Sequence, residues 1–168
     1  MTGEQTLTDG VITLRAIGHG DIPLLYEWRN DPRTRPMFRD DTPLEFTAHS
    51  RFVLGYLESG DRAYWLIIEA SHIPVGTIGL HRFSADGRGC EFGRFIVAPE
   101  YRGSGYGRRA LALLMTLAAS LGMRRISCEV LDSNTHALRL YSSLGFTAKG
   151  TSDCGPRSFI LMEAELNW

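Results

Sequence analysis

The chain has 168 residues, of which 43% are hydrophobic and 22% are charged, and its formal net charge at pH 7 is −1. This length and apolar content suffice for a substantial core, so we expect a single domain over residues 1–168. The near-neutral balance gives no overall basic field to gather nucleic acid. The absence of any run of roughly 18 apolar residues indicates no membrane span.

The first elements are a strand and a helix. Residues 11–16 alternate in polarity as a half-buried strand does. Asp21 followed by Pro23 is a helix start, because proline is tolerated in the first turn. The run Asn30-Asp31-Pro32 ends this helix, since the residue before a proline disfavours helical geometry.

A second helix start is stronger. Thr42, Pro43 and Glu45 supply in order a capping hydroxyl, a first-turn proline and a reciprocal carboxylate. This pattern predicts a helix to about Leu57, closed by the pair Ser59-Gly60.

Three strand-like runs follow at residues 64–70, 75–81 and 90–97, separated by short polar turns. Such short connections predict an antiparallel meander. Residues 97–108 then form a glycine-rich loop, and an apolar stripe behind it predicts a helix closed by Gly122.

The last third adds a strand at 126–131 and a helix capped by Ser133 or Asn134 that runs through Leu144. Two strands follow, at 146–150 and 157–166. The whole order predicts a mixed α/β sheet of about seven strands with four helices on both faces.

The glycine-rich loop predicts a phosphate-bearing ligand. Gly103, Gly105 and Gly107 allow a tight turn whose N–H groups approach a ligand, and the following helix aims its positive end at the same place. Two common nucleotide motifs are excluded. Arg108 stands where the dinucleotide-binding fingerprint needs a glycine. The phosphate-binding loop of nucleotide triphosphatases needs a lysine, and the only lysine of the chain, Lys149, lies far from this loop.

Two motifs resemble the GNAT superfamily of acetyl-CoA-dependent N-acetyltransferases, and the resemblance covers nearly the whole chain. The first motif is the loop from Arg102 to Gly107, preceded by Val97-x-Pro99. The second is Asn134-x-x-Ala137-x-x-Leu140-Tyr141-x-x-x-Gly145-Phe146. The resemblance implies a GNAT-like acyl-CoA N-acyltransferase fold and acetyl-CoA as co-substrate, with no metal.

The resemblance also implies how the coenzyme is held. Backbone groups of Phe95, Ile96 and Val97 would hold the acetyl carbonyl and the pantetheine arm, which runs like an extra strand. Asn134 would meet the pantetheine chain, and its alternative role is a helix cap alone. The loop residues that would hold the pyrophosphate are Arg102, Gly103, Ser104, Gly105, Tyr106, Gly107 and Arg108.

Tyr141 stands where the family often places the acid that protonates the departing thiolate. A phenol is protonated at neutral pH and can donate, and the less favoured alternative is a tyrosine that only packs the helix onto the sheet. Glu91 and Glu129 are the two candidates for the general base that accepts the amine proton, with Glu91 slightly preferred because it shares the strand that holds the thioester. For each, the alternative is a salt-bridged strand glutamate.

The resemblance implies direct transfer through a ternary complex without an acyl-enzyme, and the cysteines do not argue otherwise. Cys90, Cys128 and Cys154 are odd in number, widely spaced and not beside a histidine. They predict neither a disulfide framework nor a zinc site, and they favour a reducing cytoplasm. The polar residues 1–10 lack the apolar core of a signal peptide, which agrees with that location.

The N-terminal helices are expected to select the acceptor, through the candidate residues Trp28, Arg29, Asn30 and His49. These residues resemble two branches of the family, the acetyltransferases of nucleotide-linked amino sugars and those of ribosomal-protein N-termini. The amino-sugar branch is favoured, because the run Trp28-Arg29-Asn30, the short arginine-rich stretch after it and a histidine on the second helix are closer to that branch. Arg29, Arg33 or Arg35 could then meet a nucleotide diphosphate. Trp28 could instead be core and His49 a surface histidine.

A third hypothesis is a non-catalytic module that only binds acetyl-CoA. The presence of Tyr141 and the two candidate carboxylates disfavours it, since binding alone needs none of them. The final strand, Phe159–Leu166, is apolar enough to pair or pack across a homodimer.

Overall fold

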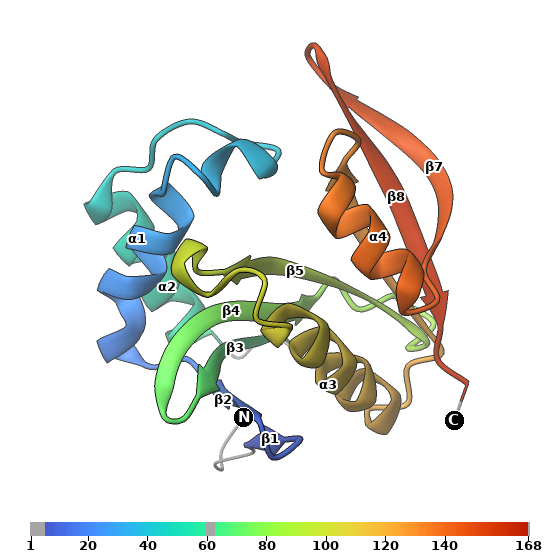
Figure 1. The fold of residues 1–168 in the computed structure, drawn as a ribbon, viewed down its shortest axis with the longest axis horizontal. Helices are drawn as coiled ribbons and strands as arrows, with labels where there is room; N and C mark the ends of the chain where they lie inside the picture. The colour runs from blue at the N-terminus through green and yellow to red at the C-terminus, as the bar shows by residue number, and fades with distance from the viewer. Residues whose placement is uncertain (1–5, 60–62, 168) are drawn as a thin grey trace.

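The computed structural model describes residues 6–59 and 63–167, which form an eight-stranded mixed sheet with four α-helices (Figure 1). The strands are β1 (Leu7–Thr8), β2 (Ile12–Ala16), β3 (Tyr64–Ala70), β4 (Ile73–His81), β5 (Gly89–Val97), β6 (Arg125–Leu131), β7 (Thr147–Cys154) and β8 (Arg157–Glu165). The helices are α1 (Ile22–Asn30), α2 (Phe46–Glu58), α3 (Tyr106–Ser120) and α4 (Thr135–Ser143). The predicted fold class and the antiparallel β3–β4–β5 meander are confirmed. Strand β1, only two residues long, is an addition to the seven predicted strands.

The helices cover both faces of the sheet, as predicted. Alternate residues of β3 show the division: Trp65 and Ile67 pack with buried residues of α1 and α2, whereas Leu66 and Ile68 pack with buried residues of α3. Helix α4 joins the α3 side, where its buried residue Tyr141 belongs to the same core. Because both faces are covered, β3 is an almost continuous apolar run.

The sheet is joined only briefly at its centre. Its strand order is β1-β2-β3-β4-β5-β6-β8-β7, and β5–β6 is the single parallel pair within the described part of the chain. The two strands pair over Gly89–Glu91 and Arg125–Ser127 and then separate. The separated ends lie between α1 and α4, where Figure 1 shows the two sides of the molecule diverge.

The predicted start of α4 and the predicted ends of α3 and α4 are confirmed, whereas the predicted start of α2 is wrong. Asn134 caps α4 by accepting a hydrogen bond from the Ala137 N–H at 3.2 Å. Gly122 and Gly145 follow α3 and α4 with φ of +86° and +91°, the left-handed geometry of a helix end.

The wrong start concerns α2. The Thr42 hydroxyl donates to Asp40 instead, at 2.6 Å. Glu45 is the cap, and its carboxylate accepts from the N–H groups of Thr47 and Ala48. Ser59 ends the helix as predicted, while Gly60 lies outside the described residues.

The final strand, β8, lies inside the sheet and not at the edge where a second copy could pair with it. β8 pairs with β6 on one side and β7 on the other, so it has no free edge on which a second copy could pair. The outer strand is β7, which is exposed along most of its length and largely polar. No helix among the described residues is long and apolar enough to cross a membrane.

Candidate active site

Two adjoining cavities occupy the region where β5 and β6 separate. One, of about 720 Å³, lies among β4, β5, β6 and α2, and we call it the strand cavity. The other, of about 920 Å³, lies beside the glycine-rich loop and α4, and we call it the loop cavity. The residues that line both cavities are Met37, Phe38, Phe95, Ile96, Asn134 and Tyr141.

The glycine-rich loop brings backbone to the loop cavity. Gly103 and Gly105 have φ of +81° and +82°, a backbone geometry that residues other than glycine rarely adopt. Gly105 caps α3 without a side-chain hydrogen bond, so the first turn of the helix turns backbone N–H groups toward the cavity. A Cβ on Gly107 would stand 3.3 Å from Val97 Cγ2 and 3.4 Å from Phe95 Cζ, so glycine lets α3 approach β5 closely. The loop therefore fits a phosphate group.

The basic side chains near the loop have different tasks. Arg102 Nη2 donates to Thr34 Oγ1 at 2.8 Å, and its other nitrogens donate to the carbonyls of Arg33 and Val97. It therefore fastens the segment after α1 to the end of β5. Arg108 donates to the Ser143 hydroxyl on α4 and lines the cavity. Tyr106, in contrast, packs against the main core.

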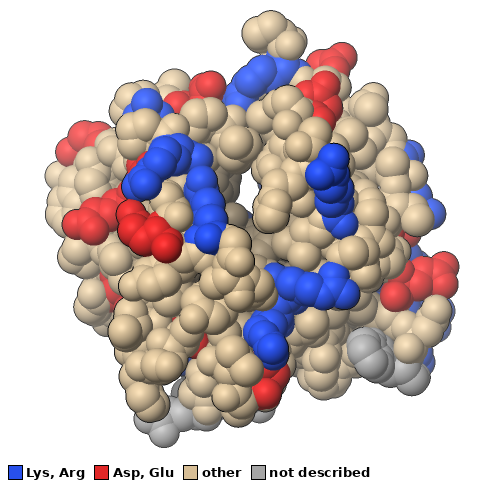
Figure 2. Space-filling model, in the orientation of Figure 1, with Lys and Arg blue, Asp and Glu red and all other residues tan. Residues whose placement is uncertain are grey.

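Sequence reasoning missed the basic residues that α4 contributes to the loop cavity. His136 and Arg139 line it from the first turns of that helix. Figure 2 shows basic side chains around the hollow between the α1 and α4 sides of the molecule. The mouth of the loop cavity is therefore positively charged, as phosphate binding requires.

The backbone of β5 is irregular where the two cavities meet. The register between β4 and β5 shifts between Thr77 and Gly79, and Arg94 has φ of +52°. Beyond Glu91, no described strand pairs with β5 on the side facing β6. The backbone of Phe95–Val97 therefore has one edge open to an extended ligand that lies beside it as a strand would.

Tyr141 lies at the junction of the two cavities. Its ring contacts Phe92 edge-on at 5.2 Å between centroids and lies 6.4 Å from Phe95 in a stacked arrangement. Burial raises the pKa of Tyr141 above its ordinary value, so the hydroxyl stays protonated over the physiological range. The side chain is therefore both a packing residue and a proton donor available to a ligand at the junction.

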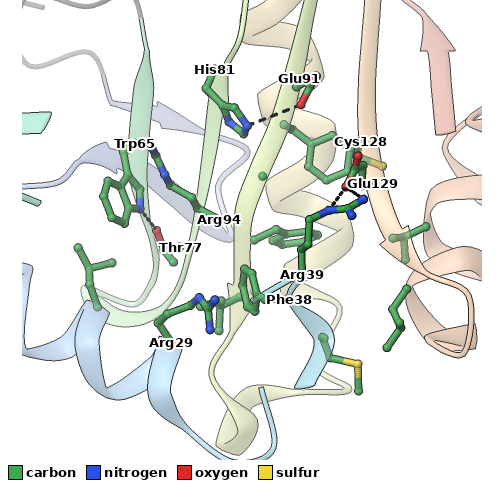
Figure 3. Close-up of a pocket in the computed structure, with 18 of the residues that line it drawn as sticks. Arg29, Phe38, Arg39, Trp65, Thr77, His81, Glu91, Arg94, Cys128 and Glu129 are labelled. Carbon is green, nitrogen blue, oxygen red and sulfur yellow. Dashed lines mark hydrogen bonds and ion pairs between the residues drawn. The ribbon is translucent and has the colours of Figure 1, made fainter. Parts of the chain in front are cut away.

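Both candidate carboxylates line the strand cavity and both are ion-paired (Figure 3). Glu129 on β6 accepts two hydrogen bonds from Arg39, at 2.7 and 3.0 Å. Glu91 on β5 accepts one from the exposed Arg82 at 3.1 Å, and its carboxylate lies 3.9 Å from His81 Nε2. The Glu91 carboxylate thus accepts fewer hydrogen bonds from described side chains than the Glu129 carboxylate does.

The structure divides the four predicted acceptor residues. Arg29 and His49 line the strand cavity. Trp28 is 7% exposed in the core between α1, α2 and β3, and it is not part of the cavity wall. Asn30 is also outside the wall: its amide donates to the Tyr26 hydroxyl at 3.2 Å and accepts from the Leu44 N–H at 2.9 Å. Its role is to hold the segment before α2.

Arg33 and Arg35 are likewise outside both cavity walls. Arg33 is instead engaged with Asp31 at 2.7 Å and Glu100 at 3.1 Å.

The pKa values of Cys128 and His81 argue against a cysteine nucleophile and against a positively charged histidine in the strand cavity. Burial raises the pKa of the Cys128 thiol to about 12, so it is a poor nucleophile at neutral pH. Burial, and then Arg94 and Arg82, lower the pKa of His81 to about 4, so its imidazole is neutral at pH 7. Among the described residues, no three His, Cys, Asp or Glu side chains are grouped as metal ligands.

The mixed sheet with its central separation, the glycine loop at the start of α3 and the capped helix α4 define a class of acyl-transfer proteins. The model of the acetyltransferase (GNAT) family matches residues 22–146, and the chain belongs to this family.

Individual relatives give more detail. An uncharacterized protein of Methanocaldococcus jannaschii, MJ1062, is 27% identical over 148 residues, which are 84% of this chain; the chain spans 30% of that relative's length. The structure is also similar to spermidine N-acetyltransferase from Vibrio cholerae in complex with CoA and spermine, with a TM-score of 0.84 at 19% identity over 94% of this chain and 97% of that one.

A third similar structure is the Salmonella typhimurium acetyl transferase that modifies the N-terminal serine of ribosomal protein L7/L12. Its TM-score is 0.82 at 16% identity, over 97% of this chain and 100% of that one. At these identities the two structural likenesses show the fold.

Proposed function

We propose that this chain is an acetyl-CoA-dependent N-acetyltransferase that moves the acetyl group to a primary amine by direct attack in a ternary complex. One observation carries the proposal: Phe95, Ile96, Asn134 and Tyr141 line both cavities. A thioester in the loop cavity and an amine in the strand cavity would therefore meet at one point. Family membership supports the same reaction.

The loop cavity fits acetyl-CoA, which when bound supplies an acetyl group activated as a thioester. The N–H groups from Gly103 to Arg108 would hold the pyrophosphate, with the positive end of α3 behind them. The open edge of β5 at Phe95–Val97 would pair with the pantetheine arm. Asn134 keeps its capping role beside that arm, because its side-chain oxygen is already engaged by α4.

Protons are handled on opposite sides of the junction. The Tyr141 hydroxyl would donate to the departing thiolate, since burial keeps it protonated. Glu91 would accept the amine proton, directly or through water, because only one hydrogen bond occupies its carboxylate. Glu129 is the alternative base, and its carboxylate would then have to accept the proton while it also accepts two hydrogen bonds from Arg39.

For the acceptor we propose a small amine, with a nucleotide-linked amino sugar as the first substrate to test. Arg29 lines the strand cavity and is suited to a phosphate. A polyamine, the acceptor named for the Vibrio cholerae structure, would need free carboxylates, whereas Glu91 and Glu129 are already paired with arginines. The reducing cytoplasm expected from the sequence remains part of this proposal.

The experiment is a thermal-shift titration followed by a thiol-release assay. Acetyl-CoA and free CoA should stabilise the protein and NAD should not, because a ligand of the folded state raises apparent stability by mass action. Thiol release should then require an amine, and nucleotide amino sugars are compared with a peptide bearing the N-terminus of a ribosomal protein. Stimulation by the peptide alone would favour a protein acetyltransferase, and binding without release by any amine would favour a non-catalytic module.

A further inference from the structure

Arg94 is the most unusual residue of the strand cavity. It lies on β5 and has φ of +52°, a left-handed geometry that costs free energy for any residue other than glycine. This geometry coincides with the register shift between β4 and β5. Arg94 lines the strand cavity and is not part of the wall of the loop cavity. The strained backbone therefore serves the acceptor side of the site.

Aromatic rings hold the Arg94 guanidinium in place. Its Cζ lies 4.4 Å from the centroid of the Trp65 ring, with Phe52 at 5.4 Å and Tyr56 at 5.7 Å. Trp65 is itself fixed, because its Nε1–H donates to Thr77 Oγ1 at 2.8 Å. Stacking satisfies the face of the guanidinium and leaves the N–H groups in its plane without partners.

No described residue is recorded as accepting a hydrogen bond from the Arg94 guanidinium. Within the described part of the chain, no carboxylate pairs with Arg94, and its buried Nη1 makes no hydrogen bond. Two other arginines on the strand-cavity wall, Arg39 and Arg82, are paired with Glu129 and Glu91. Arg29 is partly engaged, because its Nη2 donates to the Asp40 carbonyl while its buried Nη1, like that of Arg94, makes no hydrogen bond with a described residue. A partly buried charge without a partner is costly, so a ligand that pairs with it gains that compensation.

The charge around Arg94 agrees with an anionic partner. His81 lies on the neighbouring strand β4, and Arg94 is one of the charges that depress its pKa. Figure 3 shows Arg94 beside Trp65, away from the Arg39–Glu129 ion pair on the opposite wall. Of the carboxylates on the wall, Glu91 and Glu129 are paired with arginines and Glu45 caps α2, so this corner of the strand cavity carries an uncompensated positive charge.

We propose that Arg94 is a specificity-determining residue that binds a carboxylate or phosphate group of the acceptor amine, so that the enzyme selects anionic acceptors over neutral or polycationic ones. The inference rests on the proposed acetyltransfer in assigning the strand cavity to the acceptor. It goes further by naming the chemical class of that acceptor and the side chain that recognises it. The guanidinium would form paired hydrogen bonds with the two oxygens of the anion.

The first test measures binding of acetylated products and needs no turnover. The protein is saturated with free CoA, which fills the loop cavity, and is titrated while Trp fluorescence is recorded, since Trp65 stacks on Arg94. The probes are N-acetylglucosamine 1-phosphate against N-acetylglucosamine, and N-acetyl-L-leucine against its amide. An anionic probe should bind at least about tenfold more tightly than its neutral partner, and which pair shows this tells phosphate from carboxylate.

Two variants and a control identify the residue. Arg94→Gln should abolish the preference, and Arg94→Lys should retain part of it because the charge remains. Arg88→Gln, on an exposed turn, should bind like the native protein. With an acceptor found in the amine panel, Arg94→Gln should raise KM for the anionic amine at least about tenfold and change kcat little.

The outcomes separate this inference from the proposed function. Equal binding of both members of each pair, no saturable change with either anionic probe up to about 10 mM, or a preference that survives in Arg94→Gln would overturn it. The proposed function fails instead if CoA and acetyl-CoA do not bind at all. A variant whose CoA affinity matches the native protein is folded, so its lost preference is attributable to Arg94.

Discussion

Replacing Tyr141 by Phe separates its chemical role from its packing role. If the hydroxyl protonates the leaving thiolate, its loss should lower kcat by about 10²- to 10³-fold, which corresponds to about 3–4 kcal/mol of transition-state stabilisation. The ring contacts remain, because Phe92 and Phe146 lie 5.2 and 5.9 Å from the Tyr141 centroid and meet a ring in both proteins.

The same substitution should hardly change folding or coenzyme binding. The contacts that Tyr141 makes with other described side chains are ring contacts with Phe92, Phe95 and Phe146, which a phenylalanine ring retains. We expect the free energy of unfolding to change by less than about 1 kcal/mol and CoA affinity by less than about threefold.

The assay combines three measurements on one preparation. Thiol release gives kcat and KM, calorimetric titration gives the CoA dissociation constant, and a thermal melt gives stability. Tyr64→Phe is the matched control, since the Tyr64 ring packs on Phe83 in the β4–β5 connection and neither residue lines a cavity. A kcat within about threefold of the native value would refute the acid role, and equal losses in kcat and CoA affinity would indicate packing alone.

Three further predictions concern stability and the candidate base. Gly76→Ala should destabilise the protein by about 1–3 kcal/mol in a denaturant titration, because the new Cβ would stand 2.2 Å from a carbonyl oxygen of β5. The control is Gly55→Ala in α2, which has open space around it and should stabilise the protein slightly; equal effects of the two substitutions would contradict the clash. The pKa of His81 is lowered to about 4 in the folded protein, so the unfolded chain binds more protons between about pH 4 and 6.5 and stability falls as the pH drops through that window. Thermal melts of His81→Gln should therefore show a weaker dependence of stability on pH in this window, and an unchanged dependence would contradict this account. Glu91→Gln should lower kcat by about 10²-fold while Glu129→Gln changes it much less, and a steady-state comparison with the reverse order would transfer the base role to Glu129.

Local patterns predicted the elements well wherever the signal was covalent geometry or periodicity. The meander followed from alternating apolar residues and short turns, and Gly122 and Gly145 do adopt the left-handed φ that ends a helix. Asn134 caps α4 as its position suggested. The α2 start was mispredicted because two caps competed: Thr42 turns to Asp40, whereas Glu45 caps the helix with its own carboxylate.

Sequence patterns located the residues that line the loop cavity better than those that line the strand cavity, while their roles in binding stay predictions. The glycine spacing is a local signal, and it does face the loop cavity. Trp28 and Asn30 share a helix with Arg29, but helical rotation turns them into the core and toward the α2 segment. Arg94 left no signal in the sequence, because its exposure to the cavity depends on a register shift between two strands.

The brief junction between β5 and β6 has a mechanical consequence. Five strands on one side and three on the other form two parts of the sheet that are joined along three residue pairs. An extended pantetheine arm lying in the gap would tie the two parts together, so part of its binding free energy would appear as resistance to their opening. A nucleotide fragment without that arm would occupy the glycine loop and leave the two parts untied. Hydrogen exchange at the free ends of β5 and β6 should therefore slow only when the whole coenzyme is bound.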